Sequence, residues 1–253
     1  NKMDLVDYSQ EIFEDLKQSY SELAKQLNFK DITFVPLSAL EGDNVVNKSA
    51  HTPWYEGQTL MEIMEAVDIS QDKNTKDFRF PVQYVNRPHL NFRGFCGQVV
   101  SGTIKPGDSI VTLPSGKESK VKDIVTMDGN LSEAFPPLSV TLTLEDEIDI
   151  SRGDIIVKKD NQPKLSNNII ADVVWMDDVA LTPGKEYYLK IGTKETVGSV
   201  TKVNYLVNVN TQAEAQGDSL QLNEIGRVEV KLNEKVSIDP YSQNRATGSF
   251  IFI

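Results

Sequence analysis

The chain has 253 residues, with 26 Lys and Arg against 37 Asp and Glu, which gives a net charge of −11. Such an acidic chain is not expected to bind nucleic acid in general, because that affinity comes from neutralising phosphates with basic side chains. The single cysteine, Cys96, excludes an internal disulfide and a zinc site built from several cysteines, so a cytoplasmic location is expected. Apolar runs stay well short of the roughly 18 residues that cross a membrane, so no membrane partner is expected.

The chain begins with Asn1-Lys2-Met3-Asp4, which is a motif rather than a start methionine. We therefore expect the sequence to be a fragment whose upstream part is missing. Residues 1–70 hold 13 acidic and 5 basic side chains, so most of the net negative charge belongs to this first segment.

The first segment has a helical pattern, then one short apolar run, then a second helical pattern. Apolar residues three and four positions apart predict a helix within residues 12–27, which Asp7 or Ser9 can cap. Residues 32–35 predict a short buried strand, and residues 59–67 predict a second helix. The side chains expected to face inward on the two helices are Ile12, Phe13, Leu16, Tyr20, Leu23, Ala24 and Leu27, and then Leu60, Ile63, Met64 and Val67. This order of elements is typical of the last part of an α/β domain.

After a polar linker at residues 71–77, the apolar pattern changes from a period of 3.6 residues to a period of 2. Short strands separated by turn residues follow, which favours closed barrels or sandwiches. The predicted strands are residues 79–85, 97–104, 109–113, 120–126, 140–144, 154–157, 169–176, 186–191, 196–209, 226–232 and 248–253. A second polar stretch at residues 161–168 divides them. We expect three domains, at residues 1–71, 72–164 and 165–253.

The opening motif, Asn-Lys-x-Asp, is a guanine-recognition signature. The Asp4 carboxylate can accept hydrogen bonds from the ring N–H and the exocyclic amine of guanine, which adenine does not present in that arrangement. The aliphatic stem of Lys2 can lie over the base, and Asn1 can tie this loop to a phosphate-binding loop. A helix and a strand later, Ser38, Ala39 and Leu40 form the second loop that such a site requires, where a backbone N–H meets the guanine carbonyl.

The rest of a nucleotide-hydrolysing site is missing from the sequence. No G-x-x-x-x-G-K-[ST] loop occurs, and the threonine and aspartate that would handle Mg²⁺ and the attacking water are absent. We therefore expect base-recognition residues without catalytic or metal-binding residues.

Several long stretches resemble the large subunits of bacterial sulfate adenylyltransferase, a family related to the translational GTPases. The similar stretches together reach across the chain and are residues 53–60, 80–88, 92–95, 142–154, 223–228 and 244–251. Residues 97–108 also resemble the first-barrel signature of translational GTPases.

The resemblance implies the C-terminal part of a P-loop GTPase domain, of α/β class, followed by two all-β barrel domains. It implies a GTP-binding subunit that pairs with a small catalytic subunit and couples GTP hydrolysis to the formation of adenosine 5′-phosphosulfate and pyrophosphate from ATP and sulfate. Mg²⁺ is expected in the full-length protein, on residues that match nothing here, so this chain alone is expected to be inactive. The residues that match guanine recognition in the family are Asn1, Lys2, Asp4, Ser38, Ala39 and Leu40.

Two other functions remain open. One is a translation elongation factor-type GTPase that binds aminoacyl-tRNA, which would need a basic groove. The other is a β-barrel module that docks a protein partner. Arg93, between Phe92 and Phe95, suits either a partner contact or the edge of a barrel core. His51 and His89 lie beside proline-containing turns and are expected to be surface residues.

Overall fold

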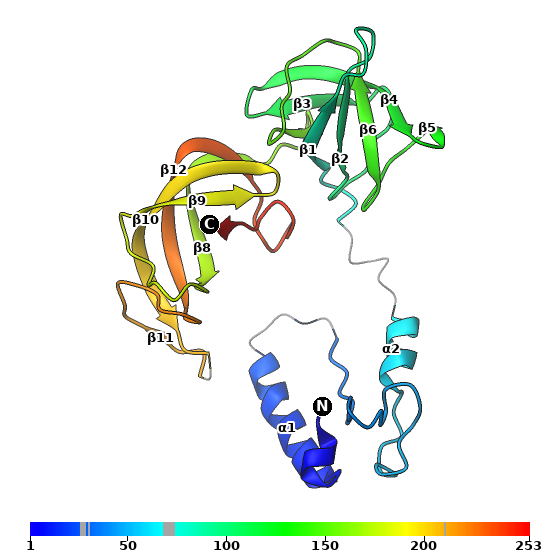
Figure 1. Ribbon diagram of the computed structural model, residues 1–253, viewed down its shortest axis with the longest axis vertical. Coiled ribbons are helices and arrows are strands. Elements are labelled where there is room, and N and C mark those ends of the chain that lie inside the picture. Colours follow the sequence, from blue (N-terminus) through cyan, green and yellow to red (C-terminus); the bar gives the residue numbers. More distant parts are fainter. Residues whose placement is uncertain (26–28, 30, 68–73, 210) are drawn as a thin grey trace. The chain divides into compact units, whose positions relative to one another are not determined.

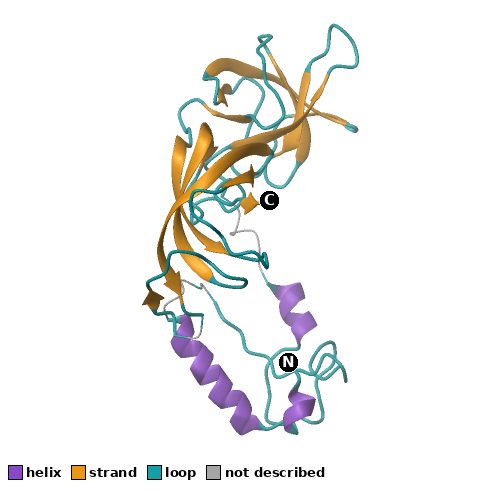
Figure 2. Cartoon of the chain, turned by 60° about the vertical axis from the view of Figure 1, so that its left-hand side comes forward, coloured by secondary structure: helices purple, strands orange, loops and turns teal. Residues whose placement is uncertain are grey.

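The computed structural model describes residues 1–25, 29, 31–67, 74–209 and 211–253. The chain forms two compact units, Asn1–Gln71 and Asp72–Ile253. Figure 1 labels the helices and strands, and Figure 2 shows that the described helices belong to the first unit and the described strands to the second.

The described part of the first unit contains one 3₁₀ turn and two α-helices. A 3₁₀ turn covers Met3–Val6, α1 covers Gln10–Ala24 and α2 covers Leu60–Ala66. The Ser9 hydroxyl accepts a hydrogen bond from the N–H of Ile12 and caps α1, so one of the two predicted caps is used. The predicted helix residue Leu27 lies outside the described residues.

The apolar stripe of α1 is less buried than its spacing predicts. Ala24 is buried, whereas Leu16 is 64% exposed and Tyr20 is also exposed. Few side chains of the described part of the unit pack against this stripe. One that does is Phe34, whose ring centroid lies 5.9 Å from that of Tyr20. The spacing therefore identified the helix correctly but overstated how much of its face is covered.

Two further predictions for this unit are wrong. Residues 32–35 are extended but form no strand, because no described segment pairs with them and a strand needs a hydrogen-bonded neighbour. Met64 and Val67 were predicted to face inward, and both are exposed. Helix α2 is only 7 residues long, and none of its residues is buried.

Helix α2 depends on a reciprocal cap at its start. The Thr59 hydroxyl accepts a hydrogen bond from the N–H of Glu62 at 3.3 Å, and the Thr59 N–H donates to Glu62 Oε2 at 2.8 Å. Replacing Thr59 with alanine should destabilise α2 by about 1 kcal/mol, measured by amide hydrogen exchange over residues 60–66. Ser19→Ala, at an exposed position within α1, is the matched control; equal effects of the two changes would contradict the capping role.

The first part of the second unit is a closed antiparallel barrel. Its sheet runs β3-β7-β1-β2-β6-β4-β5, and β3 also pairs with β4, so the path returns to its start. The strands are β1 (Arg79–Asn86), β2 (Gly94–Gln98), β3 (Ser109–Leu113), β4 (Lys117–Thr126), β5 (Gly129–Leu131), β6 (Ser139–Leu144) and β7 (Ile155–Lys158). Closure leaves every strand of this sheet except β5 paired on both sides, and β5 pairs with β4 alone.

The barrel interior holds the apolar residues that alternate along these strands, among them Phe80, Val82, Ile110, Ile124 and Leu142. The predicted strand at residues 97–104 is wrong in its bounds, since β2 ends at Gln98. At Gly102, φ is +68°, and a Cβ there would lie 2.3 Å from the Phe78 backbone. This close approach bends the chain out of strand geometry. The segment between β2 and the next strand therefore forms only isolated β-bridges.

The second part of the unit is another antiparallel sheet with its own core. Its path is β13-β9-β10-β12-β8, and β11 pairs with β10. The strands are β8 (Lys164–Val174), β9 (Glu186–Ile191), β10 (Lys194–Val207), β11 (Glu214–Ala215), β12 (Ile225–Ile238) and β13 (Ile251–Phe252). The long strands β10 and β12 curl around a core that includes Leu181, Leu189, Val200, Leu220 and Val228. The two sheets thus form the two β-barrel domains that the sequence predicts.

A buried ion pair joins the two barrels. Arg79 of β1 donates from Nε to Asp239 Oδ2 at 2.8 Å and from Nη2 to Asp239 Oδ1 at 2.9 Å. Its remaining nitrogen, Nη1, donates to the carbonyl oxygens of Phe78 and Asn161, both at 2.9 Å. The Thr247 hydroxyl donates to Asp239 Oδ2 at 2.6 Å. Both charges are therefore well satisfied, as buried charges must be.

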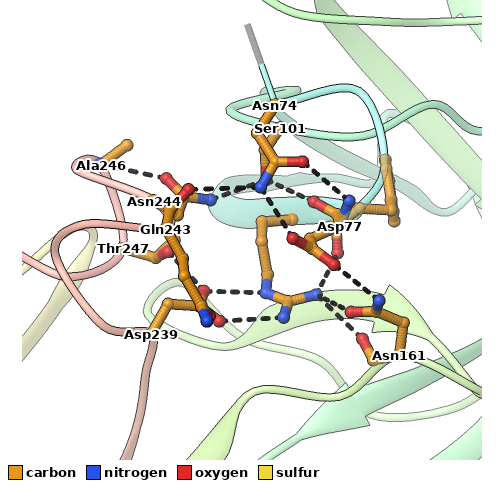
Figure 3. Close-up of polar contacts among 11 residues, drawn as sticks. Asn74, Asp77, Ser101, Asn161, Asp239, Gln243, Asn244, Ala246 and Thr247 are labelled. Atoms are coloured by element: carbon orange, nitrogen blue, oxygen red, sulfur yellow. Dashed lines mark hydrogen bonds and ion pairs between the residues drawn. The ribbon is translucent and has the colours of Figure 1, made fainter.

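Amide side chains extend this network on either side of the ion pair (Figure 3). Asn244 of the second barrel donates to the Ser101 hydroxyl of the first at 2.7 Å. Asn74 and Asn161 both donate to the Asp77 carboxylate at 2.7 Å. These two hydrogen bonds, that from Asn74 first, hold the pKa of Asp77 below its ordinary value. The seam between the barrels is thus polar and hydrogen-bonded.

Candidate functional site

The two predicted guanine-recognition loops meet in the first unit. The Ser38 hydroxyl donates to Asp4 Oδ1 at 2.6 Å, although 34 positions separate the two residues. The N–H of Met3, a buried residue, donates to the carbonyl of Leu37 at 3.2 Å. Lys2 has the left-handed conformation, with φ of 66°, which turns the chain into the 3₁₀ turn. The fold therefore brings together residues that the sequence assigned to one site.

The exposed atoms of the site are those that a ligand would meet. Asn1, Lys2, Ala39 and Leu40 are exposed, and Leu40 is 82% exposed. Ser38 is fully buried, and its hydroxyl is hydrogen-bonded to the Asp4 carboxylate. A carboxylate offers about four acceptor positions, so Asp4 keeps positions for a ligand after accepting from Ser38. The arrangement can accept two donors on the edge of a planar base.

The side chain of Asn1 makes a contact that differs from the predicted one. Its Oδ1 accepts hydrogen bonds from the N–H of Ala39 at 3.1 Å and from the N–H of Lys2 at 2.7 Å. The sequence interpretation tied Asn1 to a phosphate-binding loop, which this chain does not contain, and assigned a backbone N–H of the loop of Ser38, Ala39 and Leu40 to the guanine carbonyl. If a bound base accepts a hydrogen bond from the Ala39 N–H, the hydrogen bond from that N–H to Asn1 Oδ1 must break.

A second polar cluster lies beside the recognition loops and was missed by the sequence interpretation. Asp43 Oδ2 accepts from the Tyr8 hydroxyl at 2.6 Å, and Asp43 Oδ1 accepts from the Ser49 hydroxyl at 2.5 Å. His51 Nδ1 lies 3.2 Å from the same Oδ1. The hydrogen bonds from Ser49 and Tyr8 hold the pKa of Asp43 below its ordinary value. Both hydrogen bonds favour the charged form of Asp43.

The hydrogen bond to Asp43 raises the pKa of Tyr8 from 10.0 to about 12. We expect one of the 8 tyrosines to ionise at about that pH, seen as a difference in ultraviolet absorbance between the wild-type protein and Tyr8→Phe. Because unfolded tyrosine ionises near 10, the stabilisation from this contact is present below that pH and is lost as the pH rises to about 12. A difference that titrates near 10 would contradict the contact.

Other predicted features have simpler places in the structure. Arg93 donates from Nη2 to Asp149 Oδ1 at 3.2 Å, and its guanidinium lies 5.8 Å from the centre of the Phe95 ring, which is buried. A partner contact of Arg93 stays a prediction. His51 and His89 are exposed, as expected.

No group of three or more His, Cys, Asp and Glu side chains in the described part of the chain could hold a metal ion. None of the helices described is long and apolar enough to cross a membrane.

By its fold, the chain is similar to solved translational GTPases. The family described as GTP-eEF1A C-terminal domain-like matches residues 168–253. The crystal structure of Sup35 complexed with GDP aligns with a TM-score of 0.67 and 20% identity, over all of this chain and 64% of that one. At this identity the likeness shows the fold alone.

Relatives of higher sequence identity are named after sulfate adenylyltransferase. Sulfate adenylyltransferase subunit 1 of Saccharophagus degradans is 58% identical over 253 residues, which are all of this chain and 54% of that protein. The bifunctional enzyme CysN/CysC of Rhodopirellula baltica is 50% identical over 255 residues, 39% of its length. Over its whole length, the chain is therefore similar to proteins named sulfate adenylyltransferase subunit 1. It spans about half the length of the subunit 1 relatives that it matches.

Proposed function

We propose that this chain is part of a GTP-binding subunit of sulfate adenylyltransferase. In this proposal, GTP hydrolysis on the subunit drives the formation of adenosine 5′-phosphosulfate and pyrophosphate from ATP and sulfate. The adenylyl transfer itself belongs to a small catalytic subunit, which is the proposed partner. The complex works in the cytoplasm, where ATP and GTP are available.

The observation that carries the proposal is the hydrogen bond between Ser38 and Asp4, in a chain whose relatives are sulfate adenylyltransferase subunits. This bond holds the Asp4 carboxylate next to the loop of Ser38. In the proposed complex the carboxylate recognises guanine, and the loop supplies a backbone N–H. In the proposed complex, Asp4 accepts from the ring N–H and the exocyclic amine, and the stem of Lys2 covers one face of the base. Adenine would leave the charged Asp4 desolvated and unpaired, so the site rejects it.

The steps at the nucleotide phosphates are not assigned to residues of this chain. When bound, Mg²⁺ neutralises charge on the β- and γ-phosphates during hydrolysis. The proposed task of the residues described is to select the guanine nucleotide and to hold its base.

The experiment that tests the proposal uses the complete protein co-expressed with the small subunit. We expect the two to co-purify, and pyrophosphate release from ATP and sulfate to rise when GTP is added. A non-hydrolysable GTP analogue in place of GTP should remove the rise. Pyrophosphate release that is the same with and without GTP would contradict the coupling. Binding of aminoacyl-tRNA by the protein would favour the elongation factor alternative.

A further inference from the structure

Asp43 is bound through its backbone to the loop that carries Ser38. The Ser38 N–H donates to the Asp43 carbonyl at 3.2 Å, and the Gly42 N–H donates to the Ser38 carbonyl at 2.8 Å. These two hydrogen bonds close a turn whose exposed tip is Ala39 and Leu40. The position of Ser38, and hence of the hydroxyl that holds Asp4, depends on where Asp43 lies.

The side chain of Asp43 is bound to the other recognition loop through Tyr8. The Tyr8 hydroxyl donates to Asp43 Oδ2 at 2.6 Å, while the Tyr8 N–H donates to the Met3 carbonyl at 2.9 Å and closes the 3₁₀ turn. Tyr8 has a φ of 53°, a left-handed conformation that few residues other than glycine adopt. The chain therefore takes an uncommon conformation where it brings Tyr8 to Asp43.

The contact between Tyr8 and Asp43 is partly shielded from water and supported on several sides. The Asp43 side chain is 11% exposed, and the Ser49 hydroxyl occupies its other oxygen. The Tyr8 ring stacks on His51 with centroids 4.6 Å apart, and Trp54 Nε1 donates to the Tyr8 carbonyl at 3.3 Å. A hydrogen bond to a carboxylate is about twice as strong as one between neutral groups. This link is therefore suited to fixing the distance between the two loops.

We propose that Asp43 and Tyr8 are positioning residues for guanine selectivity, holding the loop of Ser38 and the loop of Asp4 at the separation that guanine requires. This inference rests on the proposed function. Neither residue touches the base; they act through Asp4, whose place is set by Ser38 on one side and by the 3₁₀ turn on the other.

A positioning role makes a prediction that a general structural role does not. Inosine nucleotides have the guanine ring N–H and carbonyl but lack the exocyclic amine, so the preference for GDP over IDP reports how well Asp4 is placed. When the hydrogen bond between Tyr8 and Asp43 is lost, the hydrogen bond from the exocyclic amine to Asp4 weakens most. Asp4 can accept from both the ring N–H and the amine only when the two loops are aligned. Loss of stability alone would lower the affinities for GDP and IDP by the same factor.

The test measures GDP and IDP dissociation constants for the complete protein and its Tyr8→Phe and Asp43→Asn variants. Tyr8→Phe removes one oxygen and keeps the ring stacked on His51, so it serves if Asp43→Asn does not fold. Tyr84→Phe, at an exposed position on β1 in the other unit, is the matched control. We expect GDP affinity to fall roughly tenfold, the effect of one lost hydrogen bond to a charged group, and the GDP-to-IDP preference to fall by at least about threefold.

The outcomes separate this inference from the proposed function. An unchanged GDP-to-IDP preference in both variants would overturn the positioning role, whether or not the affinities fall. A wild-type protein that binds guanine nucleotides no better than adenine nucleotides would instead contradict the proposed function, and the positioning role with it.

Discussion

Replacing Arg79 with alanine should lower the free energy of unfolding of the chain by about 3–5 kcal/mol, because it leaves the Asp239 charge buried without its partner. The side chains of Arg79 and Asp239 are only 3% and 6% exposed. Their two hydrogen bonds, of 2.8 and 2.9 Å, link the barrels. The substitution should therefore destabilise both barrels. The measurement is equilibrium unfolding in urea, followed by the fluorescence of Trp175, which lies in the second barrel core.

The chain contains a matched control for this prediction. Arg227 holds Asp172 with the same two nitrogens, at 2.8 and 2.7 Å, but their side chains are 43% and 55% exposed. Because exposed ion pairs contribute about 0–1 kcal/mol, Arg227→Ala should have a small effect. If the two alanine variants lose the same stability, burial of the Arg79 pair is not what makes it important.

Replacing Asp4 with asparagine should exchange guanine selectivity for xanthine selectivity in the complete protein. The asparagine amide would point a donor at the exocyclic amine of guanine, so two hydrogen bonds to a charged group are lost. At about 1.5–3 kcal/mol each, the affinity for GDP should fall roughly 10²- to 10⁴-fold. Xanthine has a carbonyl in place of that amine, so the same donor now finds an acceptor.

This second prediction is checked by measuring GDP and XDP dissociation constants. Asp7→Asn is the matched control, since Asp7 is exposed, follows the 3₁₀ turn and is not assigned to the base. A loss of GDP affinity without a gain for XDP would mean that Asp4 supports the loop but does not read the base.

The barrel architecture could be predicted from the sequence because it depends on local patterns. The sequence predicted β3 (Ser109–Leu113) and β9 (Glu186–Ile191) with their observed bounds, because turn residues separate the strands. In β9 buried residues alternate with more exposed ones, whereas β3 buries four residues in a row. The guanine-recognition residues could be predicted for a related reason, since Asn1, Lys2 and Asp4 form a short motif of fixed spacing.

The failed predictions concern features that depend on distant neighbours. Residues 32–35 have the composition of a strand, but a strand also needs a partner, which apolar composition alone does not supply. The strand predicted at residues 97–104 stops at Gln98 because the backbone of Phe78 approaches Gly102. Neither neighbour can be read from the local sequence.

The polar networks were missed for the same reason. Arg79 stands between two core phenylalanines, which marks it as unusual, but its partner Asp239 is 160 positions away. Tyr8 and Asp43 are separated by 35 positions and belong to no spacing motif. Buried or partly buried polar residues in apolar surroundings must find partners, so the sequence indicates that a partner exists without indicating which residue it is.

The central claim is that the site at Asp4 and Ser38 selects the nucleotide whose hydrolysis drives sulfate activation. The most direct test is adenosine 5′-phosphosulfate formation by the complete complex carrying Asp4→Asn, with GTP or XTP supplied. We predict that synthesis by this variant responds to XTP and only weakly to GTP, whereas the wild-type complex responds to GTP. Synthesis by the variant that still follows GTP, or that ignores both nucleotides while the wild type does the same, would contradict the claim.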